Sequence, residues 1–279
     1  MILTALNVYL SVSVFASAFI VFFVFTRGHA LYMRLLVAVS VGILMYTYGY
    51  MMEINSRTLA TALFWNQVQY LALPFLNAFW LLLALFYTGY LDRYLGWIPV
   101  LLFVVPVATF LIRLTNTWHQ LYYTGFGFAE VRGLALVSLQ KGPWYYVHMT
   151  YATLLALITI FILGIAAHKE SGYNRTKYVI LMVATALPLA TTVILMSGVA
   201  DTGLDYTAFV MPIVLALAVS AVVRYDFLEI ASLARDHIFQ SSEFGMFVVA
   251  RSRRIVDLNP EARRMLAALG VRPVQRSLA

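Results

Sequence analysis

Seven apolar stretches dominate the sequence, and each contains enough residues to cross a lipid bilayer as a helix. They run over residues 1–26, 35–52, 58–91, 94–112, 142–167, 178–200 and 206–223. The hydrocarbon core of a bilayer is about 30 Å thick, and a helix needs about 20 residues to cross it. The sequence therefore predicts an all-α membrane protein, built as a bundle of seven transmembrane helices.

The composition agrees with a membrane protein. Apolar residues make up 62% of the chain and charged residues 11%, which leaves too little polar surface to cover a soluble globule. The chain contains no cysteine, which excludes disulfides, cysteine-ligated metal clusters and a thiol nucleophile. The first apolar stretch has no basic start and is long for a signal peptide, so we expect a retained helix.

The basic residues carry a topology signal. The formal net charge is +7, and nine of the nineteen lysines and arginines lie from Arg224 onward. This tail, together with a small basic excess in alternate loops, predicts an N-terminus outside the cell and a C-terminus in the cytoplasm. We therefore expect membrane lipid, and no nucleic acid, as the partner of these charges.

Polar residues within the predicted spans gather toward the outer end. Such groups are costly in hydrocarbon unless they face the bundle interior or water, which favours a shared polar chamber. A hydrogen-bond network that only holds the helices together is the alternative. The candidate ligand-binding residues are Glu53, Asn66, Gln69, Tyr70, Asn77, Arg113, His148, Tyr151 and Asp205.

Several candidates also have a purely structural interpretation. Asp205 precedes an apolar run and could be only a helix N-cap. His148, with Tyr151 on the same helical face, could be a buried histidine with satisfied hydrogen bonds. Arg113 could extend its charge to the interface, and Glu53 could also be interfacial.

The long loop of residues 114–141 predicts a β-hairpin over the outer end of the bundle. A turn at residues 130–133 separates an aromatic segment from a strand at 134–139. The hairpin would bury its aromatic residues, and it could be a lid for a ligand or a passive cap. The aromatic residues are Trp118, Tyr122, Tyr123, Phe126 and Phe128.

Four prolines are predicted to kink four different helices, because proline removes a backbone hydrogen bond. They are Pro74, Pro106, Pro188 and Pro212. Trp80 is expected inside the bundle. After the last span, residues 226–240 predict a linker helix, so the predicted domains are 1–225, 226–240 and 241–279.

Short motifs follow one another between residues 60 and 225. They are Gln69-Tyr70 with Pro74, Tyr87-Thr88-Gly89, Thr115-Asn116 with His119, Gly142-Pro143-Trp144 with His148 and Tyr151, Pro188, and Gly203 to Thr207. With this set the chain resembles the N-terminal seven-helix sensor region of bacterial membrane histidine kinases. The resemblance implies a signal receptor of the bacterial cytoplasmic membrane that works as a homodimer with cytoplasmic kinase or response-regulator partners.

Residues 241–262 resemble the opening of a PAS domain, with two strands and a helix that starts at Asn259-Pro260. Fewer than 40 residues remain from residue 241, too few for a complete PAS domain of about 100 residues. No phosphoacceptor histidine segment or glycine-rich ATP lid occurs in the sequence. We therefore expect a sensor region without catalysis, cofactor or metal. Its ligand would be extracellular or membrane-borne. The ligand would be either an amphiphilic molecule or a small acid held by Arg113.

Two other functions stay open. A transporter could also use a polar chamber among kinked helices. A metal-dependent hydrolase would use His119, His148, Asp201 and Asp205 as ligands. The sequence argues against a retinal protein, because the lysines Lys141, Lys169 and Lys177 all lie outside the predicted spans and none lies on the last helix.

Overall fold

The computed structural model of the chain describes residues 2–27, 31–90, 97–131, 134–197, 203–224, 238–249 and 255–269. The chain divides into two compact units, Met1–Val222 and Val223–Ala279. The first unit contains the apolar stretches, and the second contains the short C-terminal segment.

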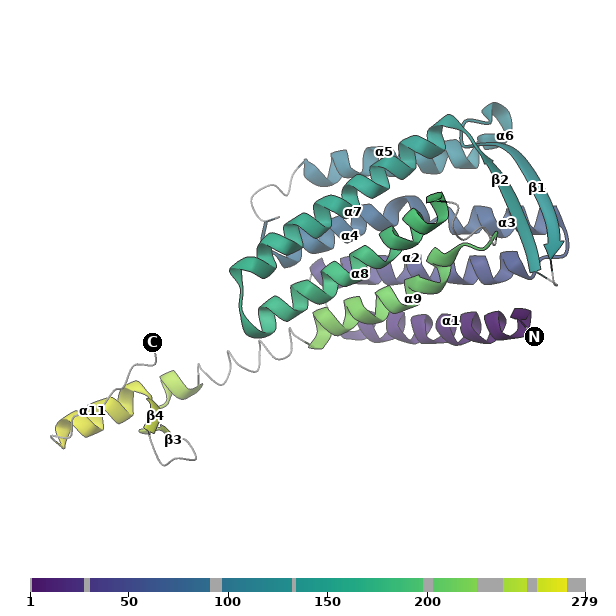
Figure 1. Ribbon diagram of the computed structural model, residues 1–279. Coiled ribbons are helices and arrows are strands. Elements are labelled where there is room, and N and C mark those ends of the chain that lie inside the picture. The colour runs from purple at the N-terminus through teal and green to yellow at the C-terminus, as the bar shows by residue number, and fades with distance from the viewer. Residues whose placement is uncertain are drawn as a thin grey trace. The chain divides into compact units, whose positions relative to one another are not determined.

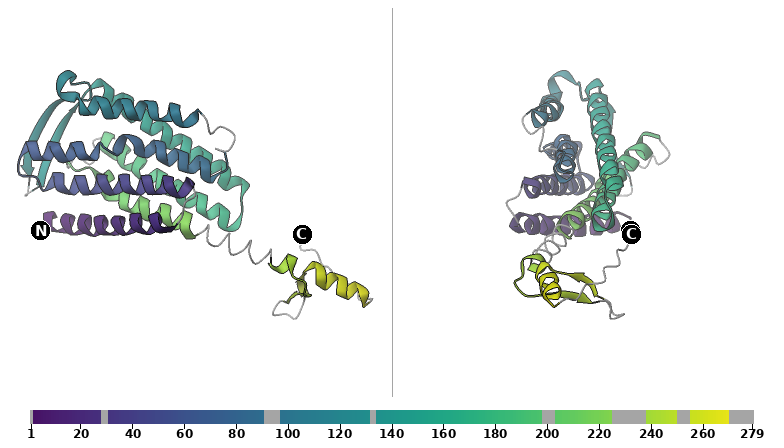
Figure 2. Two further views of the ribbon diagram at one scale, coloured as in Figure 1. Left: turned by 180° about the vertical axis from the view of Figure 1, so that it is seen from behind. Right: turned by 90° about the vertical axis from the view of Figure 1, so that its left-hand side faces the viewer.

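The helices of the first unit run alongside one another (Figures 1 and 2). Helix α2 is central, because it contacts α1, α3, α4 and α9. The helices are α1 (Ile2–Arg27), α2 (Leu31–Ile54), α3 (Leu59–Gln69), α4 (Leu73–Tyr87), α5 (Ile98–Leu114), α6 (Asn116–His119), α7 (Pro143–Lys169), α8 (Gly172–Ser197) and α9 (Tyr206–Val219). A π-helical turn, Ser220–Arg224, continues α9.

Five helical segments among the described residues are long and apolar enough to cross a membrane. They are Leu3–Thr26, Tyr32–Ile54, Leu59–Tyr87, Pro143–Lys169 and Asn174–Leu195. Two further apolar helices, Ile98–Leu114 and Tyr206–Val222, are shorter. A helical membrane bundle is confirmed, and each of the seven predicted stretches overlaps one of these segments.

One predicted kink is a helix break instead. Helix α3 ends at Gln69, and α4 begins at Leu73 with Pro74 in its first turn. Proline disfavours helical backbone in the residue before it but fits the first turn of a helix, where its missing N–H is not needed. Pro106, Pro188 and Pro212 lie inside α5, α8 and α9, as predicted.

The predicted hairpin is present. Strand β1 (Tyr123–Val131) pairs antiparallel with β2 (Leu134–Lys141), and the register places Phe126 opposite Leu139 and Phe128 opposite Val137. The hairpin crosses the end of the bundle at which α1 begins (Figures 1 and 2). Strand β2 contacts α2 and α3.

The burial of the hairpin's aromatic residues was predicted correctly only in part. Tyr122 and Tyr123 are buried, but Trp118 is 84% exposed and Phe126 is 39% exposed. Trp118 lies on the four-residue helix α6, outside the strands, where an indole can lie among lipid headgroups. The root of the hairpin, which begins with Tyr122 and Tyr123, therefore packs into the bundle, whereas Trp118 and Phe126 face outward.

Trp80 and Lys177 both lie within the bundle. The Nε1–H of Trp80 donates to Oγ1 of Thr185 at 2.8 Å, which joins α4 to α8 as expected for an interior tryptophan. Lys177 is a correction, because α8 begins at Gly172 and includes it in the span Asn174–Leu195. Its Nζ lies 4.8 Å from the ring centre of Tyr87, a cation–π contact that stabilises a buried charge. The exclusion of a retinal lysine on the last helix stands, because α9 contains none.

The second unit contains the secondary structure predicted for residues 241–279. Strand β3 (Phe247–Val249) pairs antiparallel with β4 (Ile255–Leu258), and α11 (Pro260–Ala268) follows. Most of the predicted linker helix lies outside the described residues, which resume with a helical segment at 238–241.

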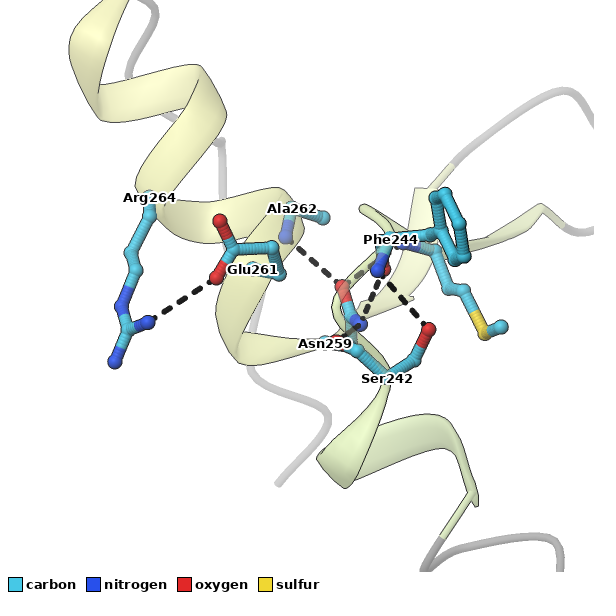
Figure 3. A network of polar contacts seen from close by, with 7 residues as sticks. Ser242, Phe244, Asn259, Glu261, Ala262 and Arg264 are labelled. Carbon is cyan, nitrogen blue, oxygen red and sulfur yellow. Dashed lines mark hydrogen bonds and ion pairs between the residues drawn. The ribbon is translucent and has the colours of Figure 1, made fainter.

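Asn259 organises this unit as the N-cap of α11 (Figure 3). Its Oδ1 accepts the backbone N–H groups of Met246 and Ala262, each at 2.9 Å. Its Nδ2 donates to the carbonyl of Phe244 at 2.8 Å and to that of Ser242 at 3.4 Å. One buried asparagine thus joins the start of the helix to the segment before β3.

Candidate ligand-binding chamber

A cavity of about 630 Å³ lies beneath the hairpin. Residues from α2, the α3–α4 region, α7, α8 and α9 form its walls, and Leu136, Val137 and Leu139 of β2 contribute from the hairpin. The volume is within the range of small-molecule sites, about 300–1,000 Å³. We refer to this cavity as the chamber.

Seven of the nine predicted site residues line the chamber. They are Glu53, Asn66, Gln69, Tyr70, Asn77, His148 and Asp205. Arg113 and Tyr151 do not line it. Tyr151 donates its hydroxyl to the carbonyl of Leu102 at 2.5 Å and so joins α7 to α5.

Glu53 lies in an acidic corner of the chamber, near the end of α2. Its Oε2 accepts hydrogen bonds from the side-chain amides of Asn66, at 3.2 Å, and Gln69, at 2.5 Å. These two donors are three residues apart and therefore share one face of α3. The carboxylate is buried and held by neutral amides, so Glu53 is not exposed at the end of α2.

Arg113 lies behind this corner. Its Nη2 donates to Oδ1 of Asn66 at 2.8 Å, so the Asn66 amide connects the Glu53 carboxylate to the Arg113 guanidinium. The guanidinium carbon lies 5.0 Å from the ring centres of both Tyr70 and Tyr123. Arg113 is only 6% exposed, so it does not extend to the interface. Its Nε has no hydrogen-bond partner among the described residues.

Asp205 is both a helix cap and a chamber residue. Its Oδ1 accepts the backbone N–H of Thr207 at 2.9 Å, which confirms the predicted N-cap of α9. Its Oδ2 accepts the hydroxyl hydrogen of Tyr46, and its own backbone N–H donates to the Tyr50 hydroxyl at 2.8 Å. The cap therefore fixes a carboxylate against α2.

Tyrosines form much of the remaining polar wall. The hydroxyls of Tyr70 and Tyr123 are 2.6 Å apart, and the Tyr122 ring meets the rings of Tyr70 and Tyr145 edge to face. Burial raises the pKa of the Tyr122 and Tyr123 phenols well above the ordinary value, so both stay protonated at neutral pH.

His148 is a buried histidine with a hydrogen-bond partner, as the structural interpretation held. Its Nδ1 lies 2.7 Å from the Tyr122 hydroxyl, which links α7 to the root of the hairpin. Because it also lines the chamber, its position is compatible with ligand contact through the rest of the ring.

The proposed metal ligands do not assemble among the described residues. His119 uses both ring nitrogens locally, since Nε2 lies 3.0 Å from Oγ1 of Thr115 and Nδ1 accepts the backbone N–H of Leu121 at 3.0 Å. Asp201 lies outside the described residues. No group of three or more His, Cys, Asp or Glu side chains suitable for a metal occurs in the described part of the chain.

Sequence reasoning missed three chamber tyrosines and the residues that position the hairpin. Tyr46, Tyr50 and Tyr145 line the chamber. The spacing of Tyr46, Tyr50 and Glu53 at four and three residues, which puts them on one face of α2, was the available signal.

Asn116 and Gly142 hold the root of the hairpin. Oδ1 of Asn116 accepts the backbone N–H groups of Tyr122, at 2.8 Å, and Tyr123, at 3.1 Å, and its Nδ2 donates to the Tyr123 carbonyl at 2.8 Å. The Gly142 N–H donates to the Tyr122 carbonyl at 2.8 Å. Both residues belong to the motifs of the sequence, but their role depends on contacts that the sequence does not display.

Comparison with known proteins gives one family. A family model described as the N-terminal 7TM region of histidine kinase matches residues 9–231, which is more than half of the chain. The matched segment contains every residue that lines the chamber. No curated protein matches the chain.

Proposed function

Because this chain belongs to the family of N-terminal seven-transmembrane regions of histidine kinases, we propose that it is a receptor whose chamber binds a small ligand and whose helices relay binding to cytoplasmic signalling domains. One observation carries this proposal. Asp205, the N-cap of α9, and Thr207 and Met211 of that helix line the chamber, and α9 is the last α-helix of the first unit. A ligand that contacts α9 therefore acts on the last element before the C-terminal unit.

The proposed topology has seven spans, with the N-terminus outside and the C-terminus in the cytoplasm of a bacterial cell. The basic tail supports this orientation. In this orientation the hairpin and the chamber belong to the outer face, which is open to extracellular or membrane-borne molecules.

The relay requires two arrangements of the helices that the ligand binds with different affinity. Helix α9 has a proline, Pro212, next to Met211 of the chamber wall, and a π-helical turn at its end. Both features weaken regular helical hydrogen bonding and allow a helix to bend. We assign the moving element of the relay to α9.

The proposed partners are a second copy of the chain and cytoplasmic kinase or response-regulator domains. Members of this family are the sensor regions of histidine kinases. The strands and helix of the C-terminal unit have the order expected at the start of a PAS domain, which supports the assignment of that unit to signalling.

The test is native mass spectrometry of the purified chain, combined with a variant that fills the chamber. Ala152→Leu adds three carbons to the α7 wall, and Ala18→Leu adds the same atoms to the exposed side of α1 as a control. We expect an organic ligand bound to the unaltered chain and to Ala18→Leu, and its loss from Ala152→Leu. Equal ligand occupancy in both variants would contradict a chamber receptor, and stoichiometric zinc would favour the hydrolase.

A further inference from the structure

The charges on the chamber wall are mainly acidic. Glu53 and Asp205 line it, and among the residues that the structure describes neither carboxylate forms an ion pair. Both are held by uncharged donors, which are amides for Glu53 and a phenol and a backbone N–H for Asp205. Uncharged donors position a carboxylate without cancelling its charge.

The basic residues nearest to the chamber are already engaged by aromatic rings. Arg113 does not line the chamber, and its guanidinium bonds Asn66 and contacts the rings of Tyr70 and Tyr123. Lys141 is on the wall, but it is exposed and its Nζ lies 5.1 Å from the ring centre of Tyr145. An anionic ligand in the chamber would therefore meet two carboxylates on the wall, whereas the Arg113 guanidinium does not line the cavity.

The tyrosine rings add a second property that favours cations. The faces of aromatic rings carry negative potential and attract ammonium or guanidinium groups. The contacts of Arg113 and Lys141 show that three rings of the wall, Tyr70, Tyr123 and Tyr145, already receive positive charges. Tyr46 and Tyr50 add two more rings to the wall, on the same face of α2 as Glu53, and both are hydrogen-bonded to Asp205.

Part of the chamber wall away from the hairpin is apolar, although Thr153, Thr185 and Thr192 also line the cavity. Along α7 its lining changes from His148, near the hairpin, to Ala152 and Ala156, one and two turns further in. Leu189 of α8 and Met211 of α9 also line it. A ligand that fills the whole cavity must therefore combine a polar head with a hydrocarbon part.

We propose that the chamber recognises an amphiphile with a positively charged ammonium head group, an inference that rests on the receptor function proposed above. The head group lies among Glu53, Asp205 and the tyrosine rings, and the hydrocarbon tail extends along Ala152, Ala156 and Met211. The carboxylates select the sign of the charge, and the rings accept an ammonium with or without N–H donors.

The experiment compares three probes with the same eight-carbon tail: octyltrimethylammonium, octanoate and 1-octanol. Each is titrated against the full chain in dodecyl maltoside micelles at pH 7 without phospholipid, and bound mass is counted by native mass spectrometry. We expect octyltrimethylammonium to bind at least about tenfold more tightly than octanoate, the factor that corresponds to about 1.4 kcal/mol. Equal or tighter binding of octanoate overturns the inference, while the receptor proposal stands because the chamber still binds a ligand.

Two matched variants locate the binding. Glu53→Gln replaces the ionisable carboxyl by a neutral amide of the same shape, and Glu170→Gln makes the same change at an exposed position after α7. We expect Glu53→Gln to weaken octyltrimethylammonium about tenfold and to leave 1-octanol unchanged, with no effect of Glu170→Gln. An unchanged affinity of Glu53→Gln for octyltrimethylammonium overturns the inference. If Glu53→Gln does not fold, the unaltered chain still tests the inference, because its failure to bind octyltrimethylammonium also overturns it.

A final competition distinguishes the source of the head group. Phosphatidylethanolamine carries its ammonium on a lipid, and methylammonium carries it on a freely diffusing ion. Displacement of octyltrimethylammonium by phosphatidylethanolamine alone supports a membrane-lipid ligand. Displacement by methylammonium supports a diffusible amine, and displacement by neither overturns ammonium recognition in the chamber.

Discussion

At the scale of the residue, Asn66 makes the contacts that hold opposite charges on two sides of one amide. It donates to Glu53 and accepts from Arg113, so each charged group depends on it. A buried polar group that loses its partner costs about 1–3 kcal/mol. The acidic corner is therefore both a hydrogen-bond network between helices and part of the chamber wall. The sequence had left these two structural interpretations open.

Asn66→Ala is expected to lower the free energy of unfolding by about 1–3 kcal/mol, because it removes the partner of Arg113 and one of the two donors to Glu53. Asn77→Ala is the control, since Asn77 also lines the chamber but forms no side-chain hydrogen bond within the described residues. Denaturant unfolding in detergent measures both. Equal stability of the two variants would show that the bridge through Asn66 contributes little.

Tyr122→Phe is expected to destabilise the chain by about 1 kcal/mol, because it removes the hydroxyl that bonds Nδ1 of His148 while keeping the ring contacts. Tyr146→Phe makes the same change on an exposed tyrosine and should be neutral. Thermal unfolding compares the two. A neutral Tyr122→Phe would mean that water replaces the hydroxyl without cost.

At the scale of the element, the hairpin depends on a close approach between its root and the start of α7. A Cβ atom on Gly142 would overlap the backbone carbonyl of Leu121, and backbone cannot move aside as a flexible side chain can. Pro143 then begins the helix directly after this contact. The Gly-Pro-Trp motif therefore fixes the hairpin and the helix together.

Gly142→Ala is expected to destabilise the chain by about 1–3 kcal/mol through this overlap. Gly164→Ala, inside the same helix, is the control, because the nearest atom that its Cβ would meet is Cε of Met182 at 3.8 Å. There the change should be neutral or stabilise by up to about 1 kcal/mol, since alanine favours helix over glycine. Melting temperatures in detergent test the pair, and a neutral Gly142→Ala would contradict the assigned close approach.

At the scale of the whole molecule, the orientation in the membrane decides which compartment supplies the ligand. The hairpin and the turn between α7 and α8 lie at opposite ends of α7 (Figure 1). Because the natural chain contains no cysteine, single cysteines report on each end without a background signal.

Ala129→Cys in the hairpin is expected to react with a membrane-impermeant maleimide in intact spheroplasts. Glu170→Cys should react only after permeabilisation, because the positive-inside rule places the α7–α8 turn in the cytoplasm. Both residues are exposed, so access to the reagent depends on the compartment. The opposite labelling pattern would invert the proposed topology, and labelling of both in intact spheroplasts would show that α7 does not cross the membrane.

The sequence by itself determined the membrane class, the order of the apolar helices, the hairpin and most of the polar residues that meet in the chamber. These follow from the chain alone because hydrocarbon requires long apolar segments and confines polar side chains to the interior. The N-cap at Asp205 and the interior position of Trp80 were predictable for the same local reasons.

Only the tertiary structure decided which side of the wall each charge occupies. Arg113 and Glu53 are separated by 60 residues in sequence, yet one amide connects them, with the carboxylate on the chamber side and the guanidinium behind the tyrosine rings. The side-chain hydrogen bonds of Asn66 also join segments that are distant in sequence. The same is true of the close approach of Gly142 to the Leu121 carbonyl, which leaves no room for a Cβ atom. Hydropathy and spacing specify which helix face is polar, whereas the sign of the charge that a ligand meets depends on how neighbouring helices pack against that face.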